Sequence, residues 1–210
     1  VFCSGSIESN TIRRNVAEGA GGAITNSGKT IRANTIEENQ ASSGAGLSAC
    51  VGLIEDNVIS RNRSFKVGGA VAGGGGALRN NRILGNQAGD GGAIYRFEGE
   101  ISNNWLVGNT ADRLGGALEG GTGPIVGNLI VDNRAGYGGA CNSVNDALVA
   151  CNTIAGNTAD QEGGGLRDCA RSRIVGNIIA YNNNVGIFVG IDETRPAQVL
   201  ANCLFGNTIA

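Results

Sequence analysis

A single phrase repeats along the whole chain. In the stretch 101–118 it reads I-S-N-N-W-L-V-G-N-T-A-D-R-L-G-G-A-L, with apolar anchors five residues apart, an Asn after each anchor and a closing Gly-Gly pair. Copies of I-x-x-N-x-I-x-x-N, with conservative apolar changes, begin every 23 to 25 residues, at Ile7, Ile31, Ile54, Leu78, Ile101, Ile125, Val149, Ile174 and Val199. Nine copies fill the 210 residues, so we expect one domain, 1–210.

The spacing of the anchors predicts strands rather than helices. Apolar residues five positions apart do not follow the 3, 4, 7 steps of a helix, and most of them are β-branched, as strands favour. A second apolar column runs Ile12, Ile36, Ile59, Ile83, Leu106, Ile130, Ile154, Ile179 and Leu204, and a third runs Ile24, Leu47, Val71, Ile94, Leu118, Cys141, Leu166 and Ile187. Three short strands per repeat, with Gly or Asn at the corners, predict an all-β, single-stranded parallel β-helix of about nine coils.

Two positions of the repeat are Asn in every copy. The first column is Asn10, Asn34, Asn57, Asn81, Asn104, Asn128, Asn152, Asn177 and Asn202, and the second is Asn15, Asn39, Asn62, Asn86, Asn109, Asn133, Asn157, Asn182 and Asn207. Asn tolerates the left-handed conformation of a tight corner, and stacked amides can bond to the copies above and below. This pattern favours a structural asparagine ladder over sugar or metal ligation.

The repeat carries a family resemblance. The phrase I-x-N-N-x-I-x-G-N-x-A-x-x-G-G-A-I resembles the right-handed parallel β-helix repeats of secreted and surface-exposed bacterial proteins, which share the pectate-lyase-like superfold. It is also similar to the G-G-A-I and F-x-x-N repeats of chlamydial polymorphic outer-membrane autotransporters, although Ile, Leu or Val stands here where those repeats have Phe. The resemblance implies a right-handed coil and an extracellular or cell-surface location. It implies no single activity, because such repeats occur in lyases, hydrolases, adhesins and passive stalks.

Composition excludes several classes of function. The chain has no His, the commonest general base and metal ligand, and a net charge of −2 without a basic stripe that would bind nucleic acid. No apolar run is long enough to insert into a membrane. Six cysteines are present, but no two share a column in adjacent coils, so we expect few or no disulfides, with Cys151–Cys169 the pair that is hardest to exclude. We expect no metal and no cofactor.

One lateral face of the predicted helix is apolar. The residues on either side of the second apolar column point outward by strand alternation. They are mostly polar in the first three coils, and from the fourth coil onward they include Leu84, Trp105, Val107, Leu129, Val131, Ile178 and Phe205. A contiguous exposed apolar patch marks a contact surface, so we predict an interface with another protein or with the rest of the parent chain. The alternative is that the inward and outward assignment slips at the corners.

A second outward row follows the Gly-Gly-Ala corner. It contains Tyr95, Glu119, Asn142 and Arg167, which together could bind a carbohydrate, with Asp168 beside them. In β-helix polysaccharide lyases, acidic residues on such a face hold Ca²⁺ and a basic residue takes the proton. The resemblance therefore makes Glu119, Arg167 and Asp168 catalytic candidates, and implies Ca²⁺ only for this alternative. The competing interpretation is scattered polar residues on a solvated sheet.

Two functions remain open. The first is a non-enzymatic extracellular scaffold for adhesion, surface display or assembly through the apolar face, and the second is a carbohydrate-active lyase or hydrolase, or a carbohydrate-binding β-helix. Uninterrupted coils and the lack of His favour the first. The chain begins at Val1 without Met and shows no capping helix, so we expect a segment of a longer secreted chain.

Overall fold

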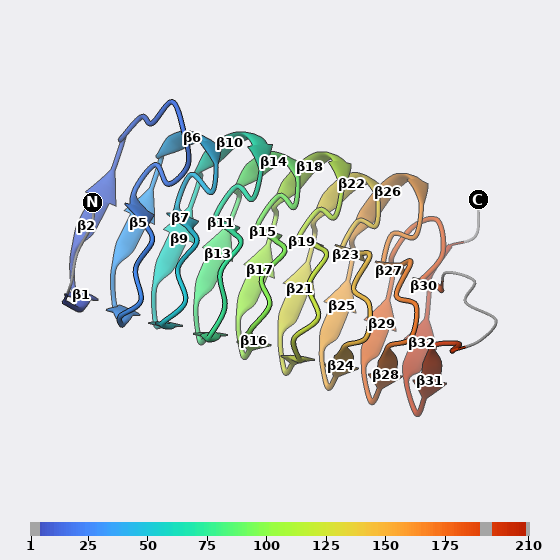
Figure 1. Cartoon of the computed structure of the whole chain (residues 1–210). Coiled ribbons are helices and arrows are strands. Elements are labelled where there is room, and N and C mark those ends of the chain that lie inside the picture. The colour runs from blue at the N-terminus through green and yellow to red at the C-terminus, as the bar shows by residue number, and fades with distance from the viewer. Residues whose placement is uncertain (1–4, 190–194, 209–210) are drawn as a thin grey trace.

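The fold is a stack of similar coils, each passing once around a common axis. The computed structural model describes residues 5–189 and 195–208, and all of its regular secondary structure there is β-strand. The coils follow one another along the axis in sequence order, from the blue N-terminal end to the red C-terminal end (Figure 1). Equivalent strands of successive coils pair in parallel, which confirms the predicted right-handed parallel β-helix.

Two sheets of nine strands run the length of the helix. Sheet A consists of β1 (Ile7–Glu8), β4 (Ile31–Arg32), β8 (Leu53–Glu55), β12 (Ala77–Arg79), β16 (Glu100–Ser102), β20 (Ile125–Val126), β24 (Leu148–Ala150), β28 (Arg173–Val175) and β31 (Gln198–Leu200). Sheet B consists of β2 (Thr11–Arg13), β5 (Thr35–Glu37), β9 (Val58–Ser60), β13 (Arg82–Leu84), β17 (Trp105–Val107), β21 (Leu129–Val131), β25 (Thr153–Ala155), β29 (Ile178–Ala180) and β32 (Cys203–Phe205).

Two shorter sheets complete the coils, with six strands in sheet C and eight in sheet D. Sheet C consists of β6 (Gln40–Ser43), β10 (Arg63–Val67), β14 (Gln87–Asp90), β18 (Thr110–Leu114), β22 (Arg134–Tyr137) and β26 (Thr158–Glu162). Sheet D consists of β3 (Ile24–Thr25), β7 (Leu47–Ser48), β11 (Val71–Ala72), β15 (Ile94–Tyr95), β19 (Leu118–Glu119), β23 (Cys141–Asn142), β27 (Leu166–Arg167) and β30 (Ile187–Phe188).

The three predicted apolar columns are confirmed as the inward rows of sheets A, B and D. Register pairs Ile101 with Ile125 in sheet A, and Leu118 with Cys141 in sheet D. Sheet C was not predicted from the sequence. It gives the central coils a fourth strand. Its inward row is small rather than strongly apolar, and it consists of Ala41, Ser64, Ala88, Ala111, Ala135 and Ala159.

The asparagine columns satisfy the backbone at the corners. In the first column Asn104 donates from Nδ2 to the backbone oxygen of Leu78 at 2.8 Å and to Oδ1 of Asn128 at 3.1 Å. The Oδ1 of Asn104 accepts from both nitrogens of Asn81, at 2.9 and 3.0 Å. The second column makes the same bonds, for example from Asn109 to Asn133 at 3.0 Å. These bonds pair polar groups that would otherwise be buried alone.

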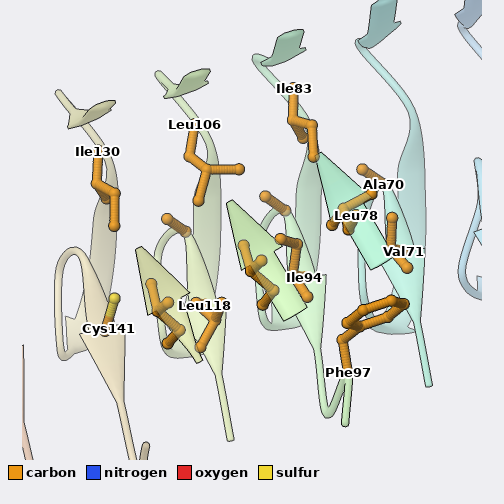
Figure 2. Packing of buried hydrophobic residues seen from close by; sticks show 14 of the residues in the cluster. Ala70, Val71, Leu78, Ile83, Ile94, Phe97, Leu106, Leu118, Ile130 and Cys141 are labelled. Atoms are coloured by element: carbon orange, nitrogen blue, oxygen red, sulfur yellow. The ribbon is translucent and has the colours of Figure 1, made fainter. Parts of the chain in front are cut away.

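The interior is a continuous column of aliphatic side chains with one aromatic ring in it. Figure 2 shows Phe97 among the layered Val, Ile and Leu side chains, and only 1% of its surface is exposed. The corresponding residues in the two neighbouring coils are Gly74 and Gly121, which have no side chains. The Phe97 ring therefore has no side chain at the equivalent position of either neighbouring coil.

No helix that could span a membrane occurs in residues 5–189 and 195–208.

Candidate functional site

The first candidate surface is an apolar band on the outer side of sheet B. Trp105, Ile178 and Phe205 are exposed, with 49% of the Trp105 surface open to solvent. The other predicted interface residues, Leu84, Val107, Leu129 and Val131, are half-buried. Register places Trp105 between Arg82 and Leu129, and Val107 between Leu84 and Val131. Ile178 and Phe205 lie further along the same two rows, beyond Thr153 in one row and beyond Ala155 and Ala180 in the other. We call the seven residues the apolar band.

The two largest aromatic rings of the apolar band, those of Trp105 and Phe205, each pack against a neighbouring side chain. The guanidinium of Arg82 lies over the Trp105 ring, 5.1 Å from its centroid. Near the other end of the sheet, Tyr181 packs edge-on against Phe205, with ring centroids 5.1 Å apart. A cation held over an indole face leaves the rest of the ring available for contact, and large aromatic rings dominate binding energies in many interfaces.

The second candidate surface is the outward row of sheet D, where it meets the ends of the sheet C strands. The outward row of sheet D does not lie on an open solvated surface as expected, because Glu119 and Asn142 are buried although they point away from the core. The ends of the sheet C strands fold over this row. Tyr137 and Glu162, the last residues of β22 and β26, contact Arg167 of β27. We call this corner, together with the cleft that Glu119 lines, the groove.

A hydrogen-bonded network crosses three coils at the bottom of the groove. Asn142 donates from Nδ2 to Oε2 of Glu119 at 2.8 Å and to Oγ of Ser143 at 2.9 Å. Its Oδ1 accepts from Nη1 of Arg167 at 2.9 Å. The guanidinium of Arg167 also donates to Glu162 at 3.2 Å and lies 4.7 Å from the centroid of the Tyr137 ring. Arg167 and Glu119 are thus joined through one amide group.

Glu119 is the most perturbed carboxyl group in the described residues. Only 7% of its surface is exposed, and its burial raises its pKa to about 7, with a further contribution from the negative charge of Asp90. The hydrogen bond from Asn142 and the charges of Arg96 and Arg167 act in the opposite direction. Asp90 is itself buried and pairs with Arg113 at 2.5 Å, so the Arg113 guanidinium is bound to Asp90 and not to Glu119.

A cleft of about 340 Å³ opens from Glu119 toward solvent. It is lined by Arg96, Glu98, Glu119, Gly120, Gly121, Thr122, Ser143 and Asn145. The backbone nitrogen of Arg96 donates to the backbone oxygen of Glu119 at 2.8 Å, and its guanidinium lies 5.1 Å from the centroid of the Tyr95 ring. The groove therefore combines two tyrosines, each stacked by an arginine, with the Asn142 amide and a carboxyl group of raised pKa.

The three catalytic candidates are not arranged as a set of free acids and bases. Glu119 is buried beneath Asn142, and Arg167 is held by Glu162, Asn142 and Tyr137. Asp168 accepts a hydrogen bond from Ser143 at 3.3 Å. The four predicted carbohydrate-binding residues form one row along sheet D, with the half-buried Tyr95 and Arg167 at either end of the buried Glu119 and Asn142.

Metal-binding donors are sparse. No group of three or more His, Cys, Asp and Glu side chains that could hold a metal ion occurs in residues 5–189 and 195–208. The five cysteines of that part are free, and Cys3 lies outside it. Burial raises the pKa of the Cys50 thiol, raises that of Cys169 to about 12 and raises that of Cys141 well above its ordinary value. These three thiols are poor metal ligands, since metals bind the thiolate.

Several groove residues escaped the sequence analysis. Asp90, Tyr137 and Glu162 end strands of the unpredicted sheet C, and Arg96 follows β15 in a left-handed conformation with φ of 47°. One sequence signal could have found the first three, because each directly precedes a Gly-Gly pair, as Leu114 does in the coil between them. In four successive coils, the residue before the Gly-Gly pair is Asp90, Leu114, Tyr137 and Glu162.

A protein-family model described as "Periplasmic copper-binding protein (NosD)" matches residues 79–210, more than half of the chain. The chain belongs to this family. The matched part of this NosD-family chain includes the whole apolar band and all of the groove residues named above. Family membership agrees with a right-handed β-helix, and the family's periplasmic location agrees coarsely with the expected export from the cytoplasm. Neither the curated proteins nor the solved structures gave a significant match.

Proposed function

We propose that this chain is a non-enzymatic, extracytoplasmic β-helix scaffold that binds another protein through the apolar band. The observation that carries the proposal is the exposed Trp105, the only Trp of the chain, within rows of apolar side chains that cross several coils of sheet B. In the first two coils the same rows are polar or charged, with Thr11, Arg13, Thr35 and Glu37. A partner with an apolar surface of its own would therefore dock on the later coils.

The regular frame suits this role. Successive coils present their outward residues at the spacing of paired strands, about 4.8 Å, on a sheet whose backbone is fixed by the ladder and by the asparagine stacks. The surface is therefore preorganised, and little conformational entropy is lost when a partner docks. The resemblance to adhesins and autotransporter repeats supports adhesion, surface display or assembly as the setting.

Replacing Trp105 by Lys is expected to weaken the binding of such a partner about thirtyfold or more, because a central aromatic contributes about 2 kcal/mol to many interfaces. The partner would be isolated from the extracytoplasmic fraction on the immobilised chain, and its affinity measured by calorimetry. Thr35→Lys, on β5 of the same sheet, is the matched control and should change the affinity little. Equal affinities for the two variants would place the contact elsewhere and overturn the proposal.

Copper binding, which the family description names, fits this chain poorly. Copper prefers imidazole, thiolate and thioether donors, and the sequence contains neither His nor Met. Three of the cysteines are buried thiols with raised pKa values, and the exposed Cys151 and Cys203 belong to no cluster of three donors in the described part. We therefore propose that the chain shares the family's frame and a periplasmic location without a copper site.

A second candidate function is saccharide binding in the groove. The observation that favours it is the outward row of sheet D, where Tyr95 pairs with Glu119 and Arg167 lies against the Tyr137 ring. Glu119 and Ser143 also line the cleft. Small-molecule sites commonly combine aromatic walls with a few fixed polar groups. The resemblance to pectate-lyase-like proteins supports the same ligand class. The held side chains of Arg167 and Asp168 support binding without cleavage, and Ca²⁺ would be needed only by a lyase.

Tyr137→Ala is expected to abolish most glycan-array binding, because it removes one aromatic wall and releases the Arg167 guanidinium that rests on it. Tyr181→Ala is the matched control, since Tyr181 is an exposed tyrosine outside the groove. A chain that binds no glycan, or a Tyr137→Ala variant with unchanged binding, would exclude this candidate. Release of unsaturated sugars from a polymer would instead show a lyase.

A further inference from the structure

Arg96 lies where its positive charge can interact with the Glu119 carboxyl group. Both side chains line the cleft, and the two residues are neighbours across the ladder, where the Arg96 nitrogen donates to the Glu119 backbone oxygen at 2.8 Å. The next residue, Gly120, has no side chain, and a Cβ there would lie 3.0 Å from Cγ of Arg96. The glycine thus gives the arginine stem room to lie across the neighbouring coil.

The charges around Glu119 leave Arg96 as the available cation. From the sheet C side, Asp90 of β14 is held by Arg113 of β18. From the sheet D side, Arg167 of β27 pairs with Glu162 and reaches Glu119 only through Asn142. The buried thiols of Cys141 and Cys169 lie inward, and Glu98 lies exposed in the same cleft. Arg96 is exposed, and in the described residues it makes no ion pair but stacks on Tyr95.

We propose that Arg96 is a proton-controlled gate of the cleft. While Glu119 carries a proton, Arg96 rests on Tyr95 and the cleft is open. When the proton leaves to solvent, the new carboxylate draws the guanidinium off Tyr95 and into an ion pair that covers the cleft. The attraction is strong because the carboxylate is buried in a medium of low dielectric, and Glu98, in solvent, competes weakly. The pKa of Glu119, about 7, sets the change at neutral pH.

The gate would regulate the groove in which saccharide binding is proposed, and so its biological use rests on that proposal. The gate can be tested without a ligand, so a failure of the gate can be distinguished from a failure of saccharide binding. Nuclear magnetic resonance of the ligand-free chain would follow the Glu119 carboxyl carbon, the Arg96 Nε and the Tyr95 ring from pH 5 to pH 9. We expect all three signals to move together with one midpoint near neutral pH.

Three variants make the result decisive. In Glu119→Gln, the Tyr95 and Arg96 signals should stay at their low-pH positions throughout. In Arg96→Gln, Glu119 should still titrate, with a midpoint higher by about half a pH unit or more, since a nearby cation has been lost. Arg82→Gln, which removes the equivalent stacking on Trp105, should leave the Glu119 midpoint unchanged.

Two results would overturn the gate. One is a Tyr95 signal that stays constant while Glu119 titrates, which would show that the arginine does not move. The other is a Glu119 midpoint that is the same in Arg96→Gln as in the wild-type chain. A chain that binds no saccharide, but shows the coupled titration, would retain the gate and remove only its proposed ligand.

Discussion

Replacing Asn104 by Leu is expected to destabilise the folded chain by about 4 kcal/mol or more. The substitution removes the acceptor for two nitrogens of Asn81 and the donor to the Leu78 oxygen and the Asn128 amide. All of these groups are buried in the centre of the helix, where each unmet hydrogen bond costs about 1–3 kcal/mol. Urea unfolding, followed by circular dichroism, would measure the loss.

The same substitution at the exposed end of the same column is the control. Asn10 donates to Asn34 at 3.1 Å and to the Glu8 backbone oxygen at 2.9 Å, but it lies in an exposed position where water can replace these bonds. Asn10→Leu should therefore cost less than about 1 kcal/mol. Equal losses at the two positions would show that the stacked amides contribute no more inside the helix than at its exposed end.

Glu119→Gln is expected to stabilise the chain at pH 8 by about 3 kcal/mol. The pKa of this carboxyl rises from 4.5 to about 7 on folding, so the folded state binds the proton more tightly than the unfolded chain. Stability from this group is therefore complete below pH 4.5 and falls as the pH rises to about 7. Glutamine is neutral at every pH and keeps an oxygen for the Asn142 amide, so it removes the cost of burying the charge.

The pH dependence separates this effect from ordinary packing. The advantage of Glu119→Gln should shrink to less than about 1 kcal/mol at pH 5, where the wild-type carboxyl is protonated in the folded state. Urea midpoints of both proteins at pH 5 and pH 8 would check this. Glu98→Gln, at an exposed position of the same cleft, is the control and should change the stability little at pH 8, because it removes a charge that is not buried. A variant that is equally or less stable at pH 8 would show that Glu119 is charged at little cost.

The sequence predicted the parts of the fold that depend on period and on large apolar residues. Columns such as Ile101 and Ile125 in sheet A repeat in type and spacing, so their pairing followed from counting. Sheet C was missed because Ala88 and Ala111, which point inward there, give a weak apolar signal. The inward position of Phe97 was missed for a related reason, since its column is occupied by glycine in both neighbouring coils.

The groove shows why outward residues were harder to interpret. Strand alternation correctly directs Glu119 away from the core, but it says nothing about which segment folds over it. That segment is the end of sheet C, and its contacts join residues such as Glu162 and Arg167, which lie on either side of a tight glycine corner. The burial of Glu119, and hence its raised pKa, depends on this corner and could not be read from a repeat that fixes only the inward rows.

The repeat forms a rigid frame, and we propose that the apolar residues that depart from it on sheet B bind a partner protein. Photo-crosslinking residues placed singly at Val107, Val131 and Glu37 would test this most directly in cells that produce the chain. We predict an adduct with one other protein from positions 107 and 131 of the apolar band and none from position 37 at the polar end of the same sheet. Adducts from all three positions alike, or only from position 37, would contradict binding through the apolar band.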